Sequence, residues 1–80
     1  MNKKEINQTK KWFKNVCKRN GLKIYIKDIQ DFNKYYHHSV LASFVVEWWT
    51  YKAVLNDGRV VSFLSNGYNV EDFKIKNKEE

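Results

Sequence analysis

Few residues in this 80-residue chain have side chains able to perform catalysis or bind a metal, and their spacing does not bring them together. His37 and His38 are adjacent, which directs them to opposite faces of a strand or about 100° apart on a helix. Cys17 is the only cysteine, so the chain cannot form an internal disulfide or a thiolate cluster for zinc. We therefore expect no metal centre.

The remaining reactive groups also lack the partners that catalysis needs. Asp28 and Asp31 could share a face, but no third acid or histidine stands at the spacing of a metal or nuclease site. The serines lack a Gly-x-Ser-x-Gly elbow, and the glycines are isolated turn residues that form no phosphate-binding loop. The sequence therefore predicts a protein that is not an enzyme and binds no cofactor.

The positive charge of the chain is concentrated near its N-terminus. Residues 1–27 contain nine Lys or Arg and one acid, Glu5, for a net charge of +8, whereas residues 28–80 contain six basic and eight acidic residues, for a net charge of −2. Together these give the +6 of the whole chain. Such an asymmetry indicates an acidic partner for one end of the molecule.

Six lysines of a predicted N-terminal helix fall within about a third of its circumference. Ammonium groups on one side of a helix can approach a phosphate backbone and release its counterions, while asparagine and arginine are better able to read bases. The candidate residues for binding a nucleic acid or another acidic partner are Lys3, Lys4, Lys10, Lys11, Lys14, Lys18, Asn7, Asn15 and Arg19. The alternative is that these lysines only keep an outward face soluble.

Aromatic side chains are the second candidate for binding. The chain has 13 of them, more than a small core readily buries, so we expect some to be exposed. Trp48 and Trp49 are adjacent on a predicted strand and must face opposite ways, one into the core and one away from it. The candidate contact residues are Tyr35, Tyr36, Trp48 and Trp49, which suit either base stacking or a protein interface.

Start, period and stop signals predict the helix that carries the lysines. Asn2 is a suitable N-cap, with Glu5 three residues later, and Asn20-Gly21 provides a C-terminal stop. The side of the helix opposite the lysines is expected to pack on the core and consists of Ile6, Thr9, Trp12, Phe13, Val16 and Cys17.

After the helix, apolar residues recur at every second position. Leu22–Lys27 alternates as a first strand should, and residues 28–38 are interpreted as a connection with at most one helical turn. Residues 39–55 favour one long strand, in which the stronger apolar face changes along its length. This change predicts a bulge or bend near residues 47–49, because an extra residue reverses which side chains point inward.

The segment Asn56-Asp57-Gly58 between two β-favouring runs predicts a hairpin loop. A three-residue loop would place Tyr51 opposite Phe63 and Ala53 opposite Val61, on the face that receives the helix.

Asn66-Gly67 is expected to end the strand Arg59–Ser65. Residues 69–72 resemble a helix N-cap followed by acids in a first helical turn. Phe73 and Ile75 are expected to dock the end of the chain.

The predicted fold class is α+β: one N-terminal amphipathic helix packed on a three- to four-stranded antiparallel sheet, in the order α-β-β-β with a short C-terminal turn or strand. Eighty residues predict a single domain spanning 1–80, with 76–80 as a frayed tail. One cysteine and the lack of a long apolar run predict a cytoplasmic protein that does not enter a membrane.

Two functions follow from these features. The first is a small binding protein that engages nucleic acid or a nucleoprotein complex through its lysines. The second is an inhibitor or regulator that binds a host protein through exposed aromatics. In its small size, its lysine and asparagine content and its lack of catalytic groups, the chain is similar to accessory proteins of phages and mobile elements, including anti-CRISPR inhibitors. The oligomeric state is left open.

Overall fold

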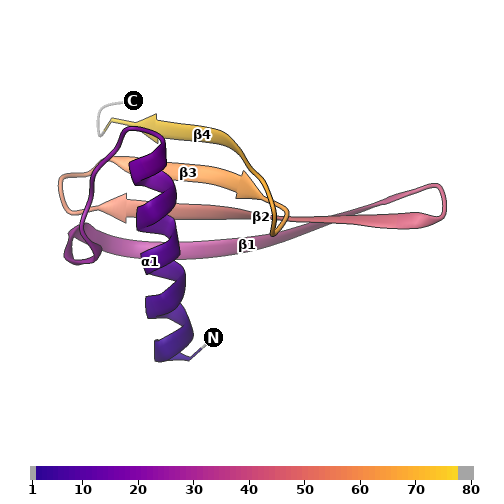
Figure 1. Ribbon diagram of the computed structural model, residues 1–80, viewed down its shortest axis with the longest axis horizontal. Helices are drawn as coiled ribbons and strands as arrows, with labels where there is room; N and C mark the ends of the chain where they lie inside the picture. The colour runs from indigo at the N-terminus through magenta and orange to yellow at the C-terminus, as the bar shows by residue number, and fades with distance from the viewer. Residues whose placement is uncertain (1, 78–80) are drawn as a thin grey trace.

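The computed structural model describes residues 2–77, which form one helix packed on one four-stranded antiparallel sheet (Figure 1). The strands follow each other in space in the order β1-β2-β3-β4. This arrangement confirms the predicted α+β class. The elements are α1 (Lys3–Arg19), the 3₁₀ turn η1 (Ile26–Asp28), β1 (Ile29–Leu41), β2 (Phe44–Leu55), β3 (Val60–Ser65) and β4 (Val70–Lys76).

Helix α1 begins and ends where the sequence predicts. The side chain of Asn2 accepts a hydrogen bond from the Glu5 backbone N–H at 2.9 Å and so satisfies one of the free donors of the first turn. At the other end, the backbone N–H of Asn20 donates to carbonyls of the last turn, and Gly21 has a φ of 85°. A left-handed residue at this position favours glycine, which explains the stop.

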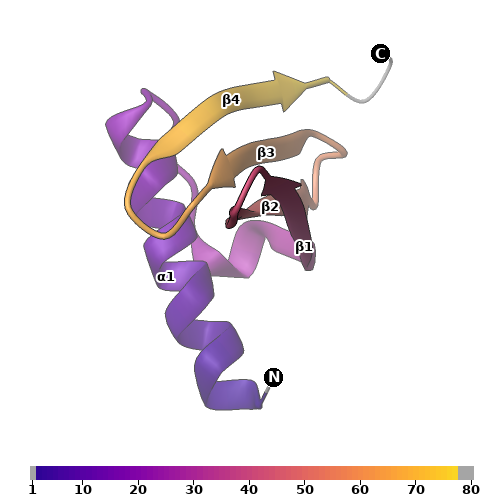
Figure 2. The same cartoon turned by 90° about the vertical axis from the view of Figure 1, so that its right-hand side faces the viewer.

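The core lies between α1 and one face of the sheet, and Figure 2 shows the helix and the sheet as two layers. Phe13, Val16 and Cys17 of the predicted apolar stripe are buried, and the other members are half-buried. The Phe13 ring stacks on Phe63 of β3, with centroids 5.0 Å apart, and meets Phe32 of β1 edge-on at 5.3 Å. The apolar stripe of α1 is therefore committed to the sheet.

The predicted strand Leu22–Lys27 is wrong. The chain is extended up to Tyr25 and then forms η1, in which the Asp28 carboxylate accepts a hydrogen bond from the Tyr25 N–H at 3.0 Å. This turn removes the Tyr25 N–H from any strand pairing. Ile24 is buried, but it anchors a linker and not a sheet strand.

The middle of the chain also differs from the prediction. Residues 28–38 are not a connection, and 39–55 are not one strand; instead, β1 and β2 form a long hairpin around Ala42 and Ser43. No bulge occurs near residues 47–49, because the register runs unbroken from Asp31 opposite Val54 to Leu41 opposite Phe44. The apparent change of buried face arises because the outer part of this hairpin extends beyond the core and buries neither face.

The hairpin between β2 and β3 is confirmed. The Leu55 N–H donates to the Arg59 carbonyl at 2.8 Å, which closes the predicted three-residue loop, and Gly58 has a φ of 92°. The predicted cross-strand pairs Tyr51–Phe63 and Ala53–Val61 are both present.

The C-terminal segment forms a strand and not the predicted capped turn at residues 69–72. β4 pairs with β3 across a register shift, and Asp72 within it has a φ of 57°. The strand brings the Phe73 ring over Phe63, with centroids 6.4 Å apart, as predicted for docking, whereas Ile75 is 42% exposed. Of the predicted tail, Lys76 ends β4 and residues 78–80 lie outside the described residues.

Candidate functional site

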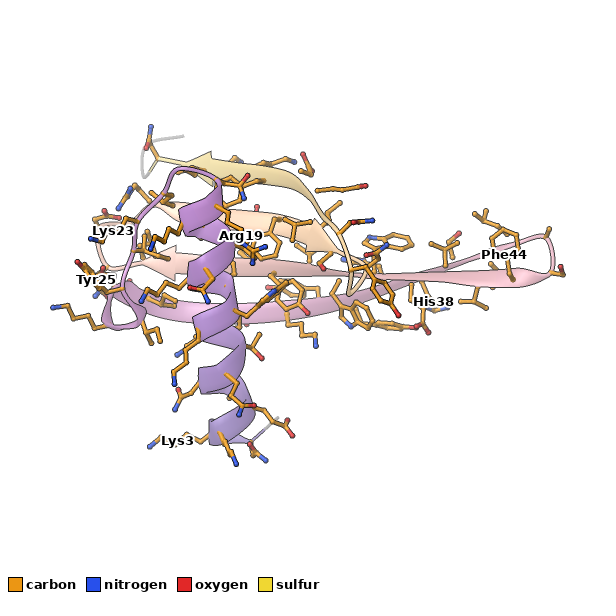
Figure 3. The ribbon with its side chains drawn as sticks, viewed as in Figure 1. Lys3, Arg19, Lys23, Tyr25, His38 and Phe44 are labelled. Carbon is orange, nitrogen blue, oxygen red and sulfur yellow. The ribbon has the colours of Figure 1, made fainter. Side chains whose placement is uncertain are left out.

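The six lysines of α1 form a surface that faces away from the sheet, which we call the lysine face. Four of its members are exposed and two, Lys10 and Lys14, are half-buried on the flanks of the helix. Lys3 and Arg19 lie at opposite ends of α1 in Figure 3, about 24 Å apart along the axis at 1.5 Å per residue. The structure therefore places all the predicted cations on one element, in a row as long as the helix.

None of these lysines is neutralised by an acid in the described part of the chain. Residues 2–77 contain two ion pairs, Arg59 with Asp57 at 2.7 Å and Lys74 with Asp72 at 3.0 Å, both on the sheet side of the molecule. Glu5 is the one acid in α1, and its carboxylate takes part in neither of these ion pairs. The lysines of this face are therefore not engaged by any acid of the described residues.

A shallow hollow lies on the N-terminal half of α1. It is lined by Lys3, Lys4, Asn7, Gln8 and Lys11, which come from successive turns of the helix. The hollow is thus lined by three ammonium groups and two side-chain amides. This arrangement combines groups that bind phosphate with groups that can hydrogen-bond a base. Asn15 is exposed farther along the helix and does not line this hollow.

A second basic group lies on the linker that follows α1, and the sequence analysis missed it. Tyr25 is 49% exposed, and its ring centroid lies 5.8 Å from the Nζ of Lys23 and 5.7 Å from the Nζ of Lys27. Figure 3 shows Lys23 and Tyr25 beside α1. The spacing Lys-x-Tyr-x-Lys was the available signal, but it was interpreted as the outer face of a strand.

The four candidate aromatics lie on the β1–β2 hairpin. Tyr35 and Tyr36 are 46% and 53% exposed, on opposite faces. Trp48 and Trp49 also face opposite ways, as predicted, and both are half-buried. Trp48 stacks on His37 on the face without the helix, with centroids 5.5 Å apart, whereas Trp49 packs against the core on the helix side.

The groups considered for chemistry have structural partners. Nε2 of His37 lies 2.9 Å from Oγ1 of Thr50, and His38 stacks on Tyr36 on the other face of the strand. Burial raises the pKa of the Cys17 thiol to about 11, which makes it a poor nucleophile at neutral pH. Among residues 2–77, no group of three His, Cys, Asp or Glu side chains could hold a metal ion.

The outer part of the β1–β2 hairpin is the most apolar exposed surface. Figure 1 shows it projecting past β3, β4 and the helix. Among the described residues, seven of the ten exposed large apolar side chains belong to it: Tyr35, Tyr36, Val40, Leu41, Phe44, Val45 and Val46. We call residues 35–48 the hairpin arm. Its unusual exposure suits contact with another protein chain.

No protein-family model matches this sequence, no curated protein matches it, and no solved structure matches its fold. In residues 2–77, no helix combines the length and the apolar composition required to cross a membrane.

Proposed function

We propose that this protein is a non-enzymatic binding protein whose lysine face engages nucleic acid or a nucleoprotein complex. The observation that carries the proposal is the hollow on α1, which is lined by three lysines without acidic partners and by Asn7 and Gln8. The helix fixes the spacing of the backbone positions that carry these groups, so binding of phosphates has to order side chains but not backbone. The lysines supply affinity, and the amides and Arg19 supply what base selectivity the face has.

The exposed Tyr25 ring on the linker favours a single-stranded nucleic acid as the ligand. Tyr25 presents an exposed ring between two ammonium groups, which is the combination that stacks a base while its phosphates are neutralised. A duplex keeps its bases stacked on each other and offers this ring nothing to stack on. The proposal therefore ranks single-stranded DNA or RNA above duplex.

The test is fluorescence anisotropy with labelled single strands and duplexes at several salt concentrations. Four to six phosphate contacts predict that the affinity for a single strand falls about 50- to 300-fold between roughly 50 mM and 200 mM salt. The test variant replaces Lys4, Lys11 and Lys18, all exposed on the lysine face, with glutamate, and should abolish binding.

A matched control changes the charge by the same amount on the other side of the sheet. Lys52, Lys74 and Lys76 are exposed, and the alternation of strand residues places them on the face without the helix. Their replacement with glutamate should leave most of the binding intact. Binding that is insensitive to salt, or that both triple variants weaken equally, would contradict a site on α1.

A second candidate function is suggested by the hairpin arm. The exposure of Tyr35 and Tyr36 favours a regulator that binds a host protein, as a phage- or mobile-element-encoded inhibitor does. In a pull-down from host lysate, a Tyr35→Ala/Tyr36→Ala variant should then lose a protein that the triple-glutamate variant of the lysine face retains. Equal recovery by the tyrosine variant and the unmodified protein would exclude this candidate.

A further inference from the structure

One edge of β2 is left open along the hairpin arm. β3 pairs with β2 only from Trp49, opposite Ser65, to Val54, opposite Val60. The preceding five residues, Phe44–Trp48, pair with β1 on one side and with no strand of the described chain on the other. An unpaired edge of this kind can accept a further strand.

The hydrogen-bonding groups at this open edge can be identified from the register. The Leu55 N–H donates to the Arg59 carbonyl, so the odd-numbered residues of β2 direct their backbone groups toward β3. From Phe44 to Val54 the pairing of β2 has no shift, so the alternation holds throughout the arm. Val45 and Glu47 therefore each present one N–H and one C=O to the open edge.

We propose that two copies of this protein pair through the open edge of β2, antiparallel, about a two-fold axis at Val46. In this register Val45 of each copy lies opposite Glu47 of the other, and four hydrogen bonds satisfy all the free groups of both edges. Moving the axis to Glu47 would oppose two carboxylates and bring the second copy against β3. Moving it to Val45 would require pairing by Ser43, which lies in the turn.

The side chains support the same register. Phe44 of each copy comes to lie opposite Trp48 of the other, on the face without the helix. Trp48 and Leu64 line a groove of about 280 Å³ at the point where β3 leaves β2. The axis thus directs an exposed phenyl ring toward an apolar groove in both copies at once, as an isologous interface requires.

The chemistry of the arm favours a second copy over an acidic or basic partner. Residues 39–46 contain no charged side chain, and the two-fold axis keeps the two Glu47 carboxylates apart. The two edge strands of the sheet are charged, with Lys34 on β1 and Lys74 and Lys76 on β4, and charge on an edge strand opposes pairing. Five residues bury less than the roughly 800 Å² per partner of a standard interface, which predicts a weak dimer.

Sedimentation of the full chain from micromolar to millimolar concentration measures this directly. The mass should rise from that of the monomer to that of the dimer. Val46→Asp should keep the chain monomeric, because it places two carboxylates at the axis. Val40→Asp is the matched control: Val40 is exposed on the same arm, but on β1, and its replacement should leave dimerisation unchanged. A protein that remains monomeric at millimolar concentration overturns the proposal.

Cross-linking tests the register itself. Two cysteines at position 46 would form a non-hydrogen-bonded pair with Cα atoms about 4.5 Å apart, which is within the range of disulfides. Cys17 is buried and does not compete. In a glutathione redox buffer, Val46→Cys should form a disulfide dimer at least about tenfold more readily than Val40→Cys, whose residue is the more exposed of the two. Equal yields, or a higher yield for Val40→Cys, overturn the register.

Discussion

Tyr36 and Glu47 are joined across the β1–β2 hairpin by a hydrogen bond from the tyrosine hydroxyl to the carboxylate, 2.8 Å long. The two residues are diagonal neighbours, because Tyr36 pairs with Trp49 and Glu47 pairs with His38. The hydrogen bond, together with lesser effects of desolvation and the nearby negative charge, raises the pKa of Tyr36. This bond links the two strands of the hairpin arm on the face that carries the helix.

The link predicts a specific alkaline sensitivity. A tyrosine whose pKa is higher in the folded protein contributes stability below its unfolded pKa and loses that contribution as pH rises through the folded value. The stability advantage of the unmodified protein over Tyr36→Phe should therefore shrink above pH 10, as measured by urea denaturation. Tyr35→Phe is the control, because the Tyr35 side chain lies on the opposite face of the hairpin from Glu47. An advantage that does not change with pH would contradict the link.

Cys17 should produce a second alkaline transition. Burial raises its pKa from 9.0 to about 11, so the protonated thiol stabilises the fold below pH 9 and this contribution is lost between pH 9 and 11. In Cys17→Ala this part of the pH dependence should be absent.

A thiol reagent should label Cys17 of the native protein only at the rate of unfolding, because the side chain is fully buried. Rapid labelling of the native protein would show that Cys17 is accessible.

Phe63 is the centre of the aromatic core. Its ring lies 5.0 Å from that of Phe13, 5.4 Å from Trp12 and 5.5 Å from Tyr51. Phe63→Ala should cost about 3–5 kcal/mol, which is most of the stability of a small domain and should leave the chain largely unfolded.

The more conservative Phe63→Leu variant should fold, with a loss of about 1–2 kcal/mol in urea denaturation. As a control, Tyr68→Ala should change stability by less than about 0.5 kcal/mol, because Tyr68 is 94% exposed. A fully folded Phe63→Ala protein would show that the helix and sheet do not depend on this ring.

Ala42, at the tip of the arm, has a φ of 57°, which is unfavourable for a residue with a Cβ atom. Ala42→Gly should stabilise the fold by about 1–2 kcal/mol because it removes the backbone strain. It should also destabilise the fold by roughly 0.4–1 kcal/mol, because glycine gives the unfolded chain more conformational entropy, so the net effect should be a small stabilisation. Slower amide hydrogen exchange in the arm should reveal it. Ser43 has no positive φ, so Ser43→Gly removes no strain and should instead make amide exchange in the arm faster. If both substitutions stabilised the arm, the effect of Ala42→Gly could not be attributed to strain at Ala42.

Local signals made the helix and the second hairpin predictable. Asn2, Glu5 and Gly21 act through contacts within a few residues, so the ends of α1 could be identified without knowledge of the rest of the fold. The loop at residues 56–58 sets the register of its two strands in the same way. The lysine face follows from the helix, because the period of a helix fixes which residues share a side.

Other features depend on the neighbours that the chain meets. Ala42 has no turn-forming character and Ser43 has only a weak one, so the pairing of β1 with β2 determines the turn between the two strands. Nothing within residues 69–72 indicates that β3 would offer them a strand edge.

The sequence by itself therefore determined α1, its lysine face and the register of β2 with β3, because each depends on contacts between residues close along the chain. The contacts of Tyr25 with Lys23 and Lys27 are local too, so the sequence held the signal for them, although their alternation was interpreted as a strand. Only the tertiary structure decided that β2 extends beyond β3, because this depends on where two strands end against each other. The open edge at Val45 and Glu47 is a difference in length between two neighbouring strands, and such a difference exists only once the sheet has formed.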